Sequence, residues 1–185
     1  MLELISTTEG LPLTPSLGYR IYGAIARHVP ELHDRPGWAL ILQRHRLGIR
    51  CEPELSGVAA KLSGLTIGLG RQSLKIGVSQ VKILEPHPIL YAPIVTIKGA
   101  IELADLTAAA RAQLDSLGID ATLAFVDRRA IDCASYQVVG YSCAAICKTP
   151  EASIALQTHG VGGRRRMGGG VFVKGAIVPH RSEDL

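Results

Sequence analysis

The stretch EPHPILYAPIVTIKG, at residues 85–99, divides this chain of 185 residues into two halves of similar pattern. EPHP ends the strand-like runs that come before it. ILYAPIVTIKG then reads as a new strand, because β-branched and aromatic residues are frequent in it. The order of strands and helices found before this point begins again after it. The sequence therefore predicts two halves that join near residues 86–89.

The first half predicts the order strand, helix, strand, strand, helix, strand. LELIST at residues 2–7 reads as a strand, and a helical pattern begins at Leu17. That helix must end near Pro30, because proline lacks a backbone donor and disfavours helix in the residue before it. WALIL and RLGIRC are expected to pair around a short basic turn. The other expected elements are a helix in EPELSGVAAKL and strands in LTIGL, LKIGV and VKIL.

The second half predicts the same order. After the strand ILYAPIVTIKG, LADLTAAARAQLDSLG has the strongest helical pattern of the chain and ends at Gly118, a C-cap glycine. TLAFV, RAIDCAS and YQVVGYSCAAIC are expected to be strands. A short helix follows in TPEASIALQTHG, with Thr149 as N-cap and Pro150 at the first position. GVFVKGAIV is the expected closing strand.

A pattern that is used twice in this way predicts an α+β fold. We expect two tandem ferredoxin-like (RRM-like) halves. Each half has βαββαβ order and an antiparallel sheet that two helices cover on one face. The expected domains are residues 1–87 and residues 88–185. Such sheets are common RNA platforms, although the fold alone does not determine a function.

The composition is that of a globular protein, with 47% hydrophobic and 19% charged residues. No apolar run approaches the roughly 20 residues that span a bilayer, and acids stand in the first ten residues where a signal peptide carries cations. We therefore expect a cytoplasmic protein with no membrane partner. The four cysteines form no CxxC pair, which excludes the usual zinc spacings and favours buried thiols.

Positive charge is concentrated near the C-terminus. The net charge is +4 and the sequence pI is about 9.0, which favours a polyanionic partner. No acidic residue occurs from Ala152 to Ser182. The cations inside that span are Arg164, Arg165, Arg166, Lys174 and Arg181.

Within this span, HGVGGRRRMGGGVF at residues 159–172 gathers six glycines and three consecutive arginines. An ATPase-type phosphate loop would need a lysine and a following helix, and a dinucleotide fingerprint would need a third glycine and a helix. RRMGGG does satisfy the acyl-CoA pattern Arg-x-x-Gly-x-Gly, so an N-acetyltransferase stays open as an alternative, as does a flexible basic surface loop. We favour a helix-to-strand connection in which the glycines let the backbone approach a phosphate chain closely. The arginines would donate hydrogen bonds to the phosphate oxygens.

This loop resembles the GhGxxxxxGhG loop (h apolar) of the CRISPR-associated repeat-processing endoribonucleases. These form the sixth Cas family of the repeat-associated mysterious protein superfamily. LGYRIYGAIARHVPELHD at residues 17–34 is similar to the family's first helix and the histidine beyond it, and APIVTIKG at residues 92–99 is similar to the start of its second half in the short subtype. Gly169 stands where the family usually has an apolar residue, so we expect a looser loop.

The resemblance implies a metal-independent endoribonuclease that cuts precursor CRISPR RNA into guide RNAs and leaves a 2′,3′-cyclic phosphate. That reaction needs an acceptor for the 2′ proton, a donor for the leaving oxygen and a cation for the phosphorane. No metal-binding motif is present, so we expect neither metal nor cofactor. The implied partners are CRISPR repeat RNA, as precursor and mature guide, and other Cas proteins of an effector complex. A non-catalytic RNA-binding subunit of such a complex is the second reading.

Two histidines lie in the matched region. At 100° per residue, His28 falls in the apolar sector of the helix with Ile21 and Ile25, so we expect it to pack against the sheet. His33 follows Pro30 in a polar segment, and the resemblance makes it the catalytic residue. Tyr19 is expected to assist. The candidate RNA-binding residues are Arg20, Arg27, Lys98, Gly160, Gly162, Arg164, Arg165, Arg166, Gly168 and Gly170.

Overall fold

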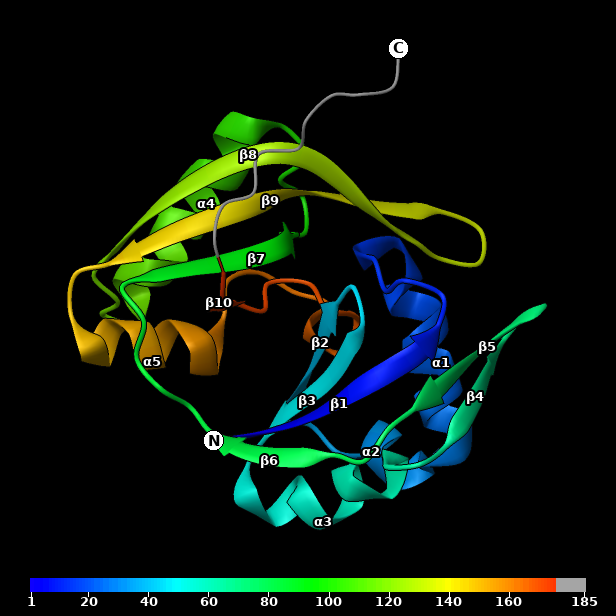
Figure 1. Cartoon of the computed structure of the whole chain (residues 1–185). Coiled ribbons are helices and arrows are strands. Elements are labelled where there is room, and N and C mark those ends of the chain that lie inside the picture. Colours follow the sequence, from blue (N-terminus) through cyan, green and yellow to red (C-terminus); the bar gives the residue numbers. More distant parts are fainter. Residues whose placement is uncertain (176–185) are drawn as a thin grey trace.

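A computed structural model describes residues 1–175, which form two antiparallel sheets with helices packed on them (Figure 1). The first half contains β1 (Leu2–Gly10), η1 (Pro15–Leu17), α1 (Gly18–His28), α2 (Pro30–His33), β2 (Trp38–Gln43), β3 (Arg46–Cys51), η2 (Pro53–Leu55), α3 (Ser56–Ala59), η3 (Ala60–Leu62), β4 (Thr66–Leu69), β5 (Gln72–Ile76) and β6 (Gln80–Ile83). The second half contains β7 (Ile89–Val95), α4 (Leu103–Ser116), β8 (Ala121–Asp132), β9 (Gln137–Cys147), α5 (Pro150–His159), η4 (Arg165–Met167) and β10 (Val173–Lys174). No helix in this described part is long and apolar enough to cross a membrane.

The first sheet has the ferredoxin-like strand order. β1 pairs with β6 on one side and with β3 on the other, and β3 pairs with β2 around the predicted basic turn. The hairpin of β4 and β5 is an addition to the βαββαβ order, and it pairs with the last residues of β1, Thr8–Gly10. The final strand of the half is therefore β6.

The second sheet repeats that arrangement in the order β10-β7-β9-β8. The separate strands predicted in TLAFV and RAIDCAS are wrong, because both belong to β8, whose register shifts between Phe125 and Arg128. The predicted closing strand is present at Val173–Lys174, and its last residues, 176–178, lie outside the described part. With these differences, the prediction of an α+β fold with two ferredoxin-like halves is confirmed.

Each half builds its own core on the face that its helices cover. Ile21 and Ile25 of α1 are fully buried against the first sheet, and Leu106 and Leu114 of α4 are fully buried in the second half. Thr149 caps α5 as predicted, since its Oγ1 accepts a hydrogen bond of 3.1 Å from the Ala152 N–H.

The helix-free faces of the two sheets meet across a small third cluster. Ala39 and Ile41 of β2 pack there against Val171 and Val173, which lie beside and within β10. Apolar contact between the halves is thus made by the chain that leaves the glycine-rich loop. The position of that loop depends on the packing of one half against the other.

Three of the four cysteines are buried and the fourth, Cys133 just after β8, is half-buried, so we predict that native protein at pH 8 has one reactive thiol, that of Cys133. Burial raises the pKa of Cys51 to about 11 and that of Cys143 to about 12, and it also raises the pKa of Cys147. Titration with Ellman's reagent should count about one fast thiol per chain, and guanidinium should release all four. Cys133→Ser is the matched control and should abolish the fast phase. Fast reaction of a second thiol in the native protein would contradict this packing.

Candidate functional site

The base of the glycine-rich loop, residues 160–172, is hydrogen-bonded to β7 and to the residue that follows it. The Gly163 N–H donates to the Thr96 carbonyl and the Gly170 N–H to the Ile94 carbonyl, each at 2.8 Å. Within the loop, the Val161 N–H donates to the Gly170 carbonyl at 3.2 Å. These hydrogen bonds fix the two arms of the loop side by side.

The tip of the loop crosses to the first half of the chain. The short turn η4 packs against α1 and β2. Gly18 at the start of α1 permits this contact, because a Cβ there would overlap the Met167 carbonyl oxygen. Three consecutive arginines are thereby carried onto the half that holds His33.

The glycines of the loop are used for close packing inside the protein. Gly160, Gly168 and Gly170 are buried, and a Cβ on Gly170 would overlap the Val161 carbonyl oxygen. The predicted loosening by Gly169 is wrong, because a Cβ at this buried residue would lie 2.6 Å from the Gly163 carbonyl oxygen. A glycine there lets the loop close. Gly162 is half-buried, and its N–H donates to Gln113 Oε1 at 2.7 Å.

The three arginines have different surroundings. Arg164 is exposed and has a φ of 62°, a left-handed conformation that is strained for a residue with a side chain. Arg165 is half-buried, and within residues 1–175 its buried Nε has no hydrogen-bond partner. Burial, together with the nearby charge of Arg50, lowers the pKa of Arg165 to about 10. Arg166 donates from Nη1 to the His33 carbonyl oxygen at 2.9 Å.

His33 lies exposed at the end of α2 and is held by an aromatic residue of α1. Tyr22 Oη lies 2.8 Å from His33 Nδ1, and the two ring centroids are 5.6 Å apart. The Arg166 guanidinium carbon lies 5.5 Å from the centroid of the Tyr22 ring, a cation–π distance. Behind them, the Trp38 ring lies 6.1 Å from Tyr22 and donates from Nε1 to the Leu32 carbonyl. The histidine is thus fixed by both halves of the chain.

These groups line one open cleft of about 650 Å³. The cleft combines an imidazole, a phenol and three guanidiniums, which are groups that can exchange a proton and bind an anion. Among residues 1–175, no three His, Cys, Asp or Glu side chains gather as metal ligands. The lining residues are Tyr22, His33, Asp34, Pro36, Gly37, Trp38, Arg164, Arg165, Arg166 and Met167.

Other predicted residues lie outside this cleft. Arg20 donates to the Leu69 carbonyl of β4, and Arg27 is exposed on the same side of α1, which is roughly opposite Tyr22 on the helix. Tyr19 is exposed and does not line the cleft. Lys98 lies exposed in the turn after β7, two residues beyond the Thr96 that binds the loop.

The prediction that His28 packs against the sheet is wrong. His28 is the last residue of α1 and is exposed, with its Nδ1 2.9 Å from the Ala24 carbonyl oxygen, while the next residue, Val29, fills the buried position. Sequence reasoning also missed Tyr22. Its position at the border of the apolar sector of α1 was the available signal, because a half-buried tyrosine there can present its hydroxyl beside the helix.

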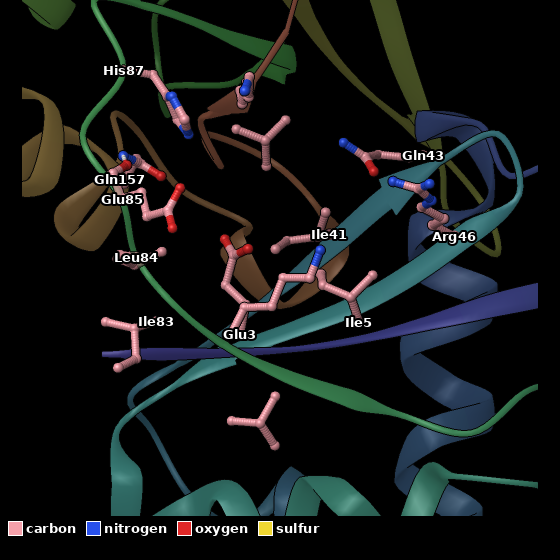
Figure 2. Close-up of a pocket in the computed structure, with 14 residues that line it drawn as sticks. Glu3, Ile5, Ile41, Gln43, Arg46, Ile83, Leu84, Glu85, His87 and Gln157 are labelled. Atoms are coloured by element: carbon pink, nitrogen blue, oxygen red, sulfur yellow. Dashed lines mark hydrogen bonds between the residues drawn. The ribbon is translucent and has the colours of Figure 1, made fainter.

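A second cavity, of about 750 Å³, opens on the helix-free face of the first sheet (Figure 2). Glu3 and Ile41 rise from its strands, and Glu85, His87 and Gln157 form the other wall. None of the predicted site residues lines this cavity.

Comparison with known proteins connects the chain to a family. The Cas6 Crispr family profile matches residues 35–176. The CRISPR-associated endonuclease Cas6 of Myxococcus xanthus is 31% identical over 184 residues, which cover 92% of this chain and 80% of that protein.

Solved structures share the fold at low sequence identity. A RAMP protein that binds different RNA substrates superposes with a TM-score of 0.62 at 15% identity, over 93% of this chain and 98% of that one. A Cas6-related protein from Pyrococcus furiosus has a TM-score of 0.60 at 11% identity, over 93% and 97%. Thermus thermophilus Cse3, bound to an RNA that represents a pre-cleavage complex, has a TM-score of 0.56 at 14% identity, over 95% and 100%. By its sequence profile, its curated relative and its paired ferredoxin-like sheets, this chain belongs to the Cas6 family.

Proposed function

We propose that this chain is a metal-independent endoribonuclease that binds CRISPR repeat RNA and cuts the precursor transcript into guide RNAs. The observation that carries the proposal is the junction of His33 with Arg166, because an imidazole and a guanidinium from opposite halves meet in one open cleft. The endonuclease name of the Myxococcus xanthus relative supports the same reading. In this proposal residues 1–87 supply the histidine and residues 88–185 supply the cations, and the protein acts in the cytoplasm, where transcripts are made.

The geometry suggests how the proton moves. When His33 Nδ1–H donates to Tyr22 Oη, Nε2 carries the lone pair that accepts the ribose 2′ proton. The 2′ oxygen attacks the adjacent phosphate, and the bond to the 5′ oxygen breaks. The imidazolium then returns its proton to that leaving oxygen, which gives a 2′,3′-cyclic phosphate and a 5′-hydroxyl. Tyr22 takes the assisting role that was predicted for Tyr19.

Arginines replace the lysine that family members often carry after the histidine. Arg164 and Arg166 line the cleft of His33 and can donate to two phosphate oxygens at once. We assign the stabilisation of the phosphorane to this pair. Gly160, Gly162, Gly168 and Gly170 shape the loop by close packing inside the protein. Lys98, Arg20 and Arg27 are assigned to contacts with more distant parts of the RNA.

The alternatives differ in what the loop can hold. An acyl-CoA site needs free backbone N–H groups at a helix N-terminus. Here the Gly163 and Gly170 N–H groups donate to the Thr96 and Ile94 carbonyl groups, and the short strand β10 follows the loop. A non-catalytic RNA-binding subunit would need the arginines alone. The hydrogen bond between Tyr22 and His33 favours the enzyme, because RNA binding by itself gives no reason to fix an imidazole.

We predict that cleavage of a repeat RNA persists in excess EDTA, that the fragment on the 5′ side of the cut ends in a 2′,3′-cyclic phosphate, and that the other fragment begins with a 5′-hydroxyl. The expectation follows because histidine and arginine can supply the proton transfers and the charge that a metal ion would otherwise supply. Product ends are read by phosphatase sensitivity and mass spectrometry. An RNA with a single 2′-deoxy residue at the cut is the control and should stay intact. Loss of cleavage in EDTA that magnesium restores, or products with 3′-hydroxyl ends, would exclude this mechanism.

A further inference from the structure

Arg50 of β3 is a fully buried arginine between the two halves of the chain. Its side chain has no exposed surface, and it points from the helix-free face of the first sheet toward the second half. Nε and Nη2 both donate to Glu3 Oε1 on the neighbouring strand β1, at 2.9 and 2.5 Å. Because burial of an arginine without a partner is costly, this ion pair is what permits the charge to lie here.

The other donors of Arg50 reach across to the second half. Nη1 donates to the Gln157 carbonyl oxygen at 2.5 Å, and Nη2 donates to the Phe172 carbonyl oxygen at 2.8 Å. Gln157 lies in the last turn of α5, and Phe172 lies just before β10. These two residues bracket the glycine-rich loop, so one guanidinium holds both of its ends.

Gln157 is anchored on its other side as well. Its Nε2 donates to the Glu85 carbonyl of the segment that joins the halves, at 2.9 Å, and Figure 2 shows Gln157 beside Glu85 on the wall of the second cavity. Glu3 stands on the opposite wall. The ion pair therefore lies where the first sheet, the joining segment and the two ends of the loop converge.

Charge also connects Arg50 to the cleft of His33. Arg165 lies close enough for the Arg50 charge to lower its pKa, and with Glu3 the three groups carry a net positive charge in a poorly solvated place. A displacement of Arg50 would therefore change the electrostatic environment of Arg165. Arg166, the next residue, donates to His33.

We propose that Arg50, balanced by Glu3, is a positioning residue for the cleavage reaction. It holds the two ends of the loop and thereby keeps Arg164 and Arg166 at the place where His33 acts. The inference rests on the proposed function for its kinetic part only. Arg50 does not line the cleft, so it acts through the loop and does not touch the reacting phosphate.

The first test is the substitution Arg50→Lys, which keeps the positive charge and removes the planar set of guanidinium N–H donors. A lysine can remain near Glu3 but cannot reach the carboxylate and both carbonyl groups in the arginine geometry. We expect the single-turnover rate at saturating RNA to fall about tenfold or more. A displacement on the order of 1 Å at a reacting centre can lower the rate by about 10²-fold. The assay runs well below the melting temperature of each variant. A folded Arg50→Lys protein that cuts at the wild-type rate would overturn the proposal.

A double variant separates positioning from stability. Arg50→Met alone leaves Glu3 partly buried without its partner, whereas Glu3→Gln with Arg50→Met removes both charges. We expect the double variant to recover melting temperature relative to Arg50→Met and still to cut about tenfold or more slowly than wild type, since the hydrogen bonds to the two carbonyl groups are absent. Recovery of the rate together with the melting temperature would reduce Arg50 to a purely structural role and overturn the proposal.

A readout without RNA distinguishes failure of this inference from failure of the proposed function. Trp38 is the one tryptophan of the chain, and it lines the cleft beside Tyr22. Its indole N–H resonance should shift in Arg50→Lys, because Arg166 moves relative to the Tyr22 ring. Lys75→Met, which breaks the exposed ion pair with Glu9, is the control and should leave the resonance in place. An unchanged resonance in Arg50→Lys overturns the inference. If the wild-type protein cuts no RNA but the resonance shifts in Arg50→Lys, Arg50 still positions the loop and only the proposed enzymatic function is rejected.

Discussion

The substitution His33→Ala is expected to lower the single-turnover cleavage rate by a factor on the order of 10² or more, the usual scale for loss of a general acid or base. His33 is exposed, and the main-chain carbonyl that accepts from Arg166 stays in place after the substitution. RNA affinity should therefore remain within about twofold of wild type. The measurement is a single-turnover time course at saturating RNA, with affinity taken from an RNA that has a 2′-deoxy residue at the cut.

Two companion variants make this result specific. Tyr22→Phe keeps the ring under Arg166 and removes only the hydroxyl that binds His33 Nδ1, so the rate should fall by less than in His33→Ala, about tenfold. His28→Ala removes an exposed ring whose hydrogen bond goes to its own helix, so both rate and melting temperature should stay near wild type. If His28→Ala stops cleavage in a stable protein and His33→Ala does not, the catalytic assignment is wrong.

The fold could be predicted from the sequence because its determinants are local. Caps such as Thr149 and Gly118, the prolines at helix starts and the strand patterns stand where short-range chemistry requires them. The same order used twice then leaves few ways to arrange the sheets. The hairpin of β4 and β5 was visible as two strand patterns, yet its place at the end of β1 depends on a pairing between distant residues that no local pattern specifies.

The site was predicted in parts and not as an assembly. The sequence indicated His33 and the arginine loop separately, but their contact joins residues 133 positions apart and depends on how one half packs on the other. Tyr22 and Arg50 were missed for the same reason, since their partners lie on other elements. Gly169 was misread because the close packing of the two arms of the loop cannot be seen in a composition rich in glycine. Membership of the Cas6 family, which rests on motifs, was predicted and is confirmed.

The second large effect is expected at the loop. Replacing Arg164, Arg165 and Arg166 together by alanine should weaken RNA binding on the order of 10²-fold or more at 0.1 M salt, because each arginine that neutralises a phosphate also releases condensed counterions. The slope of log affinity against log salt should flatten by roughly 1–3 units, about one for each phosphate that an arginine no longer neutralises. Affinity must be measured at several salt concentrations, since a single value does not separate the removal of charge from a disturbance of the fold.

The triple variant also removes hydrogen bonds within the protein, so a single position gives the sharper test. Arg166 binds the His33 carbonyl and Arg165 is half-buried, whereas Arg164 is exposed and holds a left-handed φ of 62°. Arg164→Gly removes the charge and relieves strain on the order of 1 kcal/mol, so the melting temperature should stay equal or rise. Affinity should still fall and the salt slope should flatten by about one unit, while Arg164→Lys retains the slope. Unchanged affinity and slope in Arg164→Gly would exclude Arg164 as a phosphate contact. Unchanged affinity and salt slope in the triple variant would exclude the loop as the RNA-binding element. If the arginines create the slope, their removal must flatten it, whether or not the fold is disturbed.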